Sequence, residues 1–388
     1  MTAIRRCRLL LIHGVTLCGL CSVVLLLLLQ LHVQMGDQVA VVDTYDRENF
    51  YAAGPLHLTI VDWDNEHHRR SVAASLIAGV YVLERDRQES RDAANALAPP
   101  WWAFFHFRLL RTLVDDTDRS IFGAIFEYEP KSSDSKHPKG IPHYVIAFRG
   151  TLTQRDSLKR DIELDIHLVR YGLHKTTRGQ MAIQVVRDMV AASQQKNVWL
   201  AGHSLGAAMA ILAGKEIATV GTFLETYLFN PPFMSPPIER IKDERVKHGI
   251  RFAGSVITAG LAFAMSVKQP HQKSRSVQTF STLSKWVPNL YVHPADHICS
   301  EYIGYFQHRE KMEQLGVGAI EKLATQHSLG GLVMTAFGKE AEPVHLLPSA
   351  CLTINLAPAP DLKKAHGLQQ WWQPESLVNF KTQAYLYS

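Results

Sequence analysis

Apolar residues follow two kinds of spacing along the chain, and each predicts a different element. From Ser71 to Glu84 they recur at helical spacing, which indicates an amphipathic helix, and the stretch from Thr177 to Ala192 has the same pattern. A further helical stretch is expected to end at the break Ala98-Pro99-Pro100. Shorter apolar runs predict buried strands, at Ile121 to Tyr128, Tyr144 to Phe148, Val198 to Ala201, Thr226 to Asn230 and from Asn289 onward.

The order of these elements indicates the fold class. The first two strands resemble a hairpin that leads into a central sheet. Strand, helix, strand, sharp turn and helix follow, which is the alternation of an α/β fold with a mainly parallel central sheet and flanking helices. An insertion at about residues 238–285 is polar and basic at both ends and apolar between Ile250 and Val267. We expect it to form a helical, lid-like insertion, with a second membrane contact as the alternative.

The N-terminus carries a long apolar segment. Residues 9–33 contain no Asp, Glu, Lys or Arg, and the run is long enough to cross a bilayer. Arginines precede it and aspartates follow it, which favours a single-pass anchor with the N-terminus in the cytosol. We therefore predict a hydrophobic segment at residues 1–45, a globular domain at 46–388 and a membrane-associated protein. The alternatives are a cleaved signal peptide, or a non-native extension on a cytoplasmic protein.

Composition narrows the class of protein. The 388 residues are 46% hydrophobic and 20% charged, as in an ordinary globular chain. The net charge of +5 is mild, and no block of Lys and Arg indicates nucleic-acid binding. Beyond the N-terminal segment only Cys299 and Cys351 remain, so there is no disulfide framework, which argues against a body placed in an oxidising compartment. No metal-ligand spacing, phosphate loop or dinucleotide fingerprint occurs, so we expect no metal and no cofactor.

The strand that begins at Val198 ends in Gly202-His203-Ser204-Leu205-Gly206, which has the form of a nucleophile elbow. Such an elbow places the serine on a strained turn, so that Oγ stands clear of the sheet. The two glycines are needed because a Cβ at either position would clash with the neighbouring strand and helix. The N–H of Leu205 would then face a developing oxyanion, and His203 is expected to be a packing or scaffold residue.

Two later residues complete a candidate triad. Asp296 follows the strand at Asn289, and His366 follows a Pro-rich loop, so the order Ser204, Asp296, His366 is that of α/β-hydrolases. In such a triad the histidine takes the proton of the serine, and the carboxylate orients the histidine. Other residues remain candidates for the same two roles: Asp243 and Asp361 for the acid, and His293, His327 and His345 for the base.

Together with Phe148-Arg149-Gly150-Thr151, the elbow and triad residues resemble the class 3, or fungal-type, lipases, and flanks such as Ala365-His366-Gly367 resemble a plant branch of them. Some members of that branch carry a GDSL esterase/lipase name. The resemblance extends from about Gly54 to the C-terminus. It implies an α/β-hydrolase domain that hydrolyses carboxylic esters of lipids, with Thr151 as the second oxyanion donor beside Leu205.

One motif departs from that name. Arg155-Asp156-Ser157-Leu158 has arginine where a GDSL block has glycine, so Ser157 is interpreted as an ordinary residue. The expected function is hydrolysis of acylglycerols or other lipid esters, with a lipid or small ester as substrate and no nucleic-acid partner. Two alternatives stay open: a catalytically weak scaffold that binds an acyl ligand or a partner, and an acyltransferase.

Overall fold

The computed structural model describes residues 46–129, 140–152, 172–193, 197–233, 280–316 and 345–387, together with parts of 238–258. The chain divides into two compact units, Met1–Ala53 and Gly54–Ser388. The described part of the first unit holds the short helix α2 (Phe50–Ala53). The apolar segment at residues 9–33 lies outside the described residues, so the membrane anchor remains a prediction.

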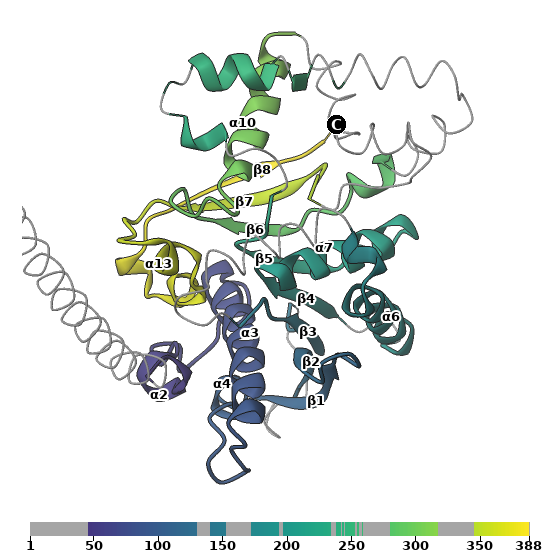
Figure 1. Ribbon diagram of the computed structural model, residues 1–388, viewed down its shortest axis with the longest axis vertical. Coiled ribbons are helices and arrows are strands. Elements are labelled where there is room, and N and C mark those ends of the chain that lie inside the picture. Colours follow the sequence, from purple (N-terminus) through teal and green to yellow (C-terminus); the bar gives the residue numbers. More distant parts are fainter. Residues whose placement is uncertain are drawn as a thin grey trace, which may run out of the picture. The chain divides into compact units, whose positions relative to one another are not determined.

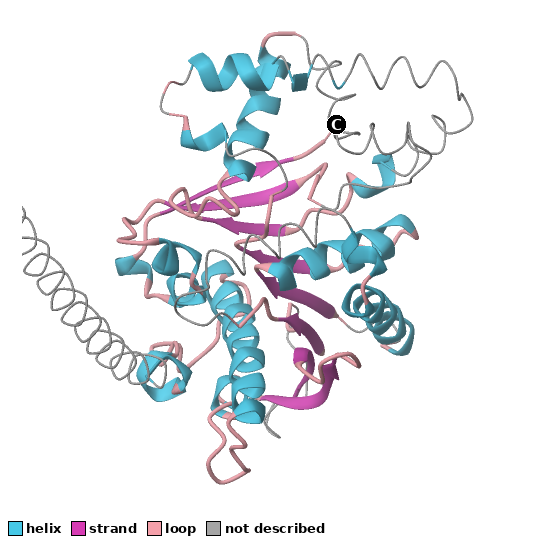
Figure 2. Cartoon of the chain, in the orientation of Figure 1, coloured by secondary structure: helices cyan, strands magenta, loops and turns pink. Residues whose placement is uncertain are grey.

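The second unit is built on one sheet of eight strands whose spatial order follows the sequence order (Figure 2). The first three strands pair antiparallel, the third to the seventh are parallel, and the last is antiparallel to the seventh. The strands are β1 (Phe107–Val114), β2 (Ile121–Tyr128), β3 (Tyr144–Phe148), β4 (Val198–His203), β5 (Glu225–Phe229), β6 (Asn289–Val292), β7 (Ala350–Asn355) and β8 (Phe380–Tyr385).

Helices cover both faces of this sheet (Figure 1). One face is covered by α3 (Glu66–Gln88), and the other by α6 (Thr177–Ala192) and α7 (Leu205–Thr219). Other helices among the described residues include α4 (Pro100–Ala103), α10 (Glu301–Gln314), α13 (Leu362–His366) and the short 3₁₀ segments Leu173–Lys175, Ile238–Arg240, Leu368–Trp372 and Glu375–Leu377. The unit therefore has the α/β-hydrolase fold that the sequence predicts.

The central strands are buried on both faces because their side chains alternate between the two helical layers. In β4, the ring of Trp199 packs 4.9 Å from that of Tyr227 on the α3 side. Its neighbour Leu200 belongs instead to the apolar core that α6 and α7 cover. Two-sided burial explains why these strands read as continuous apolar runs in the sequence.

The predicted strands and α6 are present, but three details differ from the sequence expectations. Helix α3 is longer than the apolar pattern, because the side chain of Asn65 caps its first turn by accepting from the N–H groups of His67 and His68. No helix ends at Ala98: this stretch is a loop, and the carboxylate of Asp86 accepts from the N–H groups of Leu97 and Ala98. Strands β1, β7 and β8 were not predicted.

The described part of the insertion packs against α10. Arg251 donates to the carboxylates of Glu239 (2.9 Å) and Glu301 (2.5 Å), and Ser255 Oγ lies 3.0 Å from His308 Nε2. Glu301 is almost completely buried, so its contact with Arg251 lies between the insertion and the helix. The lid-like role of the insertion remains a prediction.

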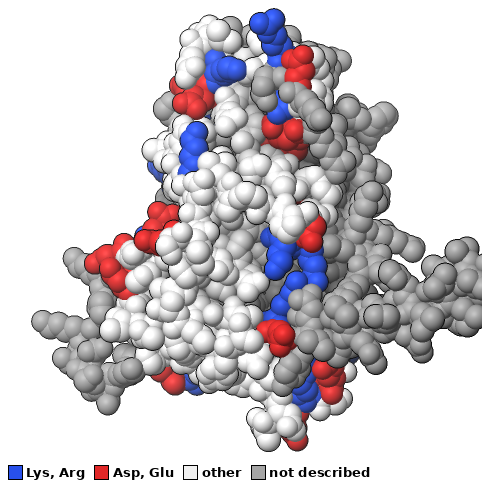
Figure 3. All heavy atoms as spheres, turned by 90° about the vertical axis from the view of Figure 1, so that its left-hand side faces the viewer, with Lys and Arg blue, Asp and Glu red and all other residues white. Residues whose placement is uncertain are grey.

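Charged side chains of both signs are mixed on one face of the molecule (Figure 3). On the face shown in Figure 3, Lys and Arg lie near Asp and Glu, and uncharged residues occupy most of the described surface between them. Within the described parts of the chain, no helix is both long enough and apolar enough to cross a bilayer.

Candidate active site

Three polar residues follow the carboxyl ends of three adjacent parallel strands. Ser204 comes directly after β4, Asn230 directly after β5, and Asp296 four residues after the end of β6. The strand ends are aligned, since His203 pairs with Phe229 and Phe229 pairs with Tyr291. The carboxyl edge of a parallel sheet is the usual location of a ligand or catalytic site in this fold class.

Ser204 occupies the turn between β4 and α7 in a strained backbone conformation. Its φ is 55° and its ψ is −126°, a region that residues with a side chain rarely adopt. The N–H of Ser204 donates to the carbonyl of Phe229 at 3.0 Å, which ties the turn to the next strand. A strained serine at a strand-to-helix turn is the defining feature of the nucleophile elbow.

The two glycines of the elbow are there because the backbone passes too close for any side chain. A Cβ on Gly202 would overlap the carbonyl of Gly206, and one on Gly206 would overlap the carbonyl of Phe148 in β3. The first contact is with the following helix and the second with the neighbouring strand, as the sequence argument predicts. Tight packing of α7 on the sheet therefore depends on both glycines.

Asp296 and His366 form a buried pair. Nδ1 of His366, the last residue of α13, lies 2.8 Å from Oδ2 of Asp296. Burial alone would raise the pKa of Asp296, but the neighbouring His366 and hydrogen bonds from His366, Cys299 and Asn230 outweigh it and hold the pKa below its usual value. Asp296 thus stays ionised, and the carboxylate orients His366 so that Nε2 is the available basic nitrogen.

Asn230 organises this pair, and the sequence reasoning did not identify it. It adopts a positive φ of 47°, which asparagine tolerates better than most residues. Its Nδ2 donates to Asp296 Oδ2 at 2.7 Å and to the carbonyl of Ala365 at 3.1 Å, while its Oδ1 accepts from Trp371 Nε1 at 2.8 Å. The available signal was a polar residue immediately after an apolar strand at the carboxyl edge of the sheet.

The candidate oxyanion donors lie on two sides of the elbow. Leu205 is the first residue of α7, where backbone N–H groups have no partner within the helix. Thr151 follows Gly150, and Gly150 packs so closely on the elbow that a Cβ there would lie 2.8 Å from Ser204 Cβ. Both N–H groups therefore belong to backbone next to the nucleophile.

Arg149 holds the loop that carries Thr151. This buried guanidinium donates through Nε to the carbonyl of Ile121 and through Nη1 to the carbonyl of Gly150, both at 2.6 Å. Its Nη2 lies 4.0 Å from the buried carboxylate of Glu84 on α3. In the Phe148-Arg149-Gly150-Thr151 motif, Arg149 thus holds the loop in place, a role that sequence spacing alone does not reveal.

The described rivals for the acid and the base have other contacts. Asp361 caps α13 by accepting from Lys364 N, and Asp243 caps a helical turn by accepting from Arg245 N. His293 donates through Nε2 to the carbonyl of Ala357 and accepts from Ala295 N through Nδ1. The ring of His345 packs against that of Phe233. His327 and Ser157 lie outside the described residues.

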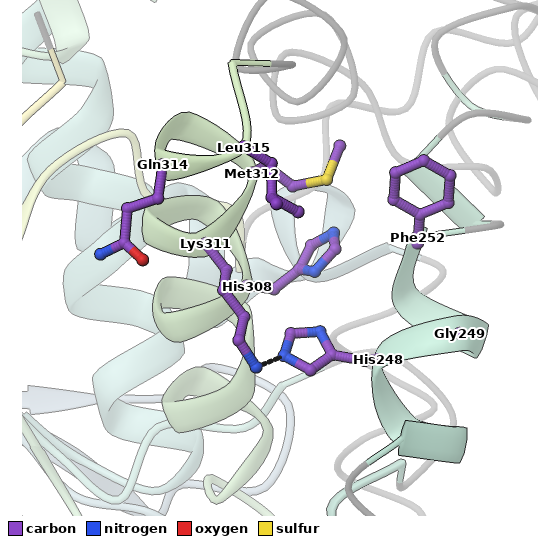
Figure 4. Close-up of a pocket in the computed structure, with 8 residues that line it drawn as sticks. All are labelled: His248, Gly249, Phe252, His308, Lys311, Met312, Gln314 and Leu315. Carbon is purple, nitrogen blue, oxygen red and sulfur yellow. Dashed lines mark hydrogen bonds between the residues drawn. The ribbon is translucent and has the colours of Figure 1, made fainter.

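A separate cavity of about 450 Å³ lies between the insertion and α10 (Figure 4). Phe252, Met312 and Leu315 supply apolar walls, and His248 meets Lys311 at its edge. None of its lining residues belongs to the triad. Among the described residues, no group of three or more His, Cys, Asp and Glu side chains could hold a metal ion.

Comparison with known proteins identifies the family of this chain. The family model described as Lipase (class 3) matches residues 139–237, which include Thr151 and the elbow. A GDSL esterase/lipase of Arabidopsis thaliana is 56% identical over 351 residues, a match that covers 88% of this chain and 99% of the relative. The chain belongs to the class 3 lipase-like family. Membership of this esterase and lipase family indicates a carboxylic ester hydrolase. Asp296 and His366 lie beyond the matched segment, so their assignment rests on geometry.

Two solved lipase structures also match this class 3 lipase-like chain. The lipase of Rhizopus microsporus var. chinensis is 18% identical, with a TM-score of 0.28, over 43% of this chain and 58% of that structure. A propeptide complex of Rhizomucor miehei lipase is 16% identical, with a TM-score of 0.27, over 43% of this chain and 52% of that structure. The chain thus matches little more than half of the length of these two solved lipases.

Proposed function

We propose that this protein hydrolyses carboxylic esters of lipids through Ser204 as nucleophile, His366 as general base and Asp296 as the acid that orients it. The observation that carries the proposal is the buried Asp296–His366 hydrogen bond at the sheet edge where Ser204 occupies a strained turn. Acylglycerols are the substrates that a lipase of this family would be expected to take.

The first half of the reaction acylates the serine. Ser204 Oγ attacks the ester carbonyl while Nε2 of His366 takes its proton, which makes an otherwise weak nucleophile reactive. The tetrahedral oxyanion accepts hydrogen bonds from the N–H groups of Leu205 and Thr151. Each such donor contributes about 10²–10³ to the rate because it faces charge that develops only in the transition state. The intermediate then expels the alcohol, which receives the proton from His366.

The second half releases the acid. Nε2 of His366 takes a proton from water, the resulting hydroxide attacks the acyl carbonyl, and the same two N–H groups stabilise the second oxyanion. Collapse of this intermediate frees the carboxylic acid and returns the proton to Ser204. Throughout, the ionised Asp296 stabilises the positive charge that His366 carries transiently.

We also propose that residues 9–33 place the enzyme at a membrane. The segment is apolar and contains no Asp, Glu, Lys or Arg. An anchor of this kind would hold the catalytic unit near a lipid substrate.

The test is ester hydrolysis by the full chain in mild detergent. Wild-type protein is compared with Ser204→Ala on p-nitrophenyl esters of short and long acyl chains. We expect the substitution to reduce turnover by about 10⁴-fold or more, as loss of a triad serine does elsewhere. The chain-length profile then distinguishes an esterase from a lipase.

Ser157→Ala is the matched control, because it removes the serine that the GDSL name of the relative would suggest. It should retain wild-type turnover. Activity that survives Ser204→Ala but not Ser157→Ala would refute the proposed nucleophile. If folded protein shows no Ser204-dependent hydrolysis, the alternatives are the scaffold or the acyltransferase, and adding an alcohol acceptor tests the latter.

A further inference from the structure

A chain of hydrogen bonds connects the two sides of the candidate active site. The N–H of Gly150 donates to Tyr81 Oη at 2.7 Å, and Tyr81 Oη lies 2.8 Å from Nδ1 of His203. On the other side of the ring, Nε2 of His203 lies 2.7 Å from the carbonyl oxygen of His366. Tyr81 belongs to the middle of α3, so one helix residue links the Thr151 loop, the elbow and the base.

One contact determines which atom donates and which accepts in every hydrogen bond of this series. The carbonyl of His366 can only accept, so Nε2 of His203 must carry the proton and donate. Nδ1 of a neutral His203 is then an acceptor, and the hydroxyl of Tyr81 must donate to it. Burial lowers the pKa of His203 to about 3, which keeps the ring neutral and this arrangement intact at ordinary pH.

The same geometry excludes a direct catalytic role for the tyrosine hydroxyl. Tyr81 has a single hydroxyl proton, and that proton is donated to His203. It is therefore not available to stabilise an oxyanion while the chain is intact.

The contacts around Gly150 show why this linkage matters at the reacting centre. A Cβ on Gly150 would lie 2.7 Å from Tyr81 Oη and 2.8 Å from Ser204 Cβ, so the tyrosine hydroxyl and the nucleophilic serine both pack closely against the backbone of Gly150. Gly150 precedes Thr151, and His203 precedes Ser204 and contacts the His366 ring at 4.8 Å between centroids. A shift of Tyr81 would thus move a candidate oxyanion donor and the base together.

We propose that Tyr81 and His203 are positioning residues, which hold the Thr151 loop and His366 in fixed places relative to Ser204. This inference rests on the proposed serine mechanism. Misplacing a reacting group by about 1 Å can cost about 10²-fold in rate. The linkage should therefore affect kcat far more than KM, because it acts on the transition state rather than on the affinity for the lipid chain.

The variants follow from the hydrogen bonds. Tyr81→Phe keeps the ring and removes the hydroxyl that joins Gly150 to His203. His203→Gln keeps an amide donor that can reach the carbonyl of His366, but offers no acceptor at the position of Nδ1. Tyr302→Phe is the matched control, because this buried tyrosine of α10 loses only its hydroxyl, which donates to the carbonyl of His345 at 3.1 Å.

Two rates are measured on the full chain in detergent. One is turnover of a p-nitrophenyl ester, and the other is covalent labelling of Ser204 by an alkyl fluorophosphonate. In the labelling step an Oγ–P bond forms, fluoride leaves, and His366 takes the serine proton, so the rate reports the same base and oxyanion donors without a carboxylic ester.

We expect Tyr81→Phe and His203→Gln each to lower kcat and the labelling rate about 10- to 100-fold, with KM within about twofold of wild type and a folded circular dichroism spectrum. The two changes break one shared bond, so the double variant should be no more than about threefold slower than the slower single variant. Tyr302→Phe should leave both rates at the wild-type level.

Several outcomes would overturn the inference. One is a folded Tyr81→Phe variant with wild-type rates, and another is a Tyr302→Phe variant that loses as much rate as Tyr81→Phe. The third is a double variant whose fold-loss in rate equals the product of the two single losses, which would indicate that the two residues contact the reagent independently. Failure of the proposed function has a different signature. Wild-type protein would then label at Ser204 yet hydrolyse no ester, and the labelling rates would still decide the role of Tyr81. If wild-type protein is not labelled at Ser204, both the proposed function and the positioning role of Tyr81 and His203 are refuted.

Discussion

Replacing Asn230 with glycine should weaken both the fold and the catalytic pair. Glycine keeps the positive φ of this position, so the change removes the side-chain bonds without adding backbone strain. Besides a weak bond from Nδ2 to Cys299 Sγ at 3.6 Å, three hydrogen bonds are lost: one to the Asp296 carboxylate at 2.7 Å, one to the Ala365 carbonyl at 3.1 Å and one from Trp371 Nε1 at 2.8 Å.

The magnitude follows from the kind of bond. A hydrogen bond to a charged acceptor contributes about 1.5–3 kcal/mol, and each of the other two makes a net contribution of about 0.5–1.5 kcal/mol. The free energy of unfolding should therefore fall by about 3–5 kcal/mol. Asn230→Ala should lose about 1 kcal/mol more, because alanine is strained at positive φ.

Urea unfolding followed by tryptophan fluorescence measures the loss, and kcat on a p-nitrophenyl ester measures the effect on the site. We expect the unfolding midpoint to fall by about 1 M urea, and kcat to fall about 10-fold because the Asp296–His366 pair loses its orientation. A midpoint within about 0.2 M of wild type, together with unchanged kcat, would refute the reasoning that Asn230 supports the pair.

Three further changes test other parts of the site. Asp296→Asn should lower kcat about 10⁴-fold, because His366 loses the carboxylate that sets its tautomer; an ester assay that finds less than a tenfold loss would contradict this role. The depressed pKa of Asp296 should stabilise the fold above about pH 4, the usual unfolded value, and this contribution should disappear as pH falls through the lower folded value. Urea titrations at several acidic pH values should therefore show a steeper loss in wild type than in Asp296→Asn. Gly206→Ala should prevent stable folding or cost more than about 3 kcal/mol, because its Cβ would overlap the Phe148 carbonyl. In the control Gly249→Ala the Cβ meets nothing within 4 Å, and thermal unfolding should show no loss.

Several features of this protein could be predicted from the sequence because they depend on local spacing. The apolar runs predict β2, β3, β4 and most of β5, and the helical spacing predicts α6. The elbow is also a local signal, since the two glycines flank Ser204 within five residues. Chain order then nominates Asp296 and His366 as its partners.

The tertiary structure decided which polar groups meet. Asp296 and His366 are 70 residues apart, Asn230 and Trp371 are 141 apart, and Tyr81 and His203 are 122 apart, so no periodic pattern relates them. A half-buried polar residue such as Tyr81 interrupts the apolar pattern of its helix without indicating its partner. Only packing of α3, the sheet edge and α13 brings these groups within hydrogen-bonding distance. Local spacing therefore determined the elements and the nucleophile, whereas long-range packing determined the groups that orient and position the catalytic residues.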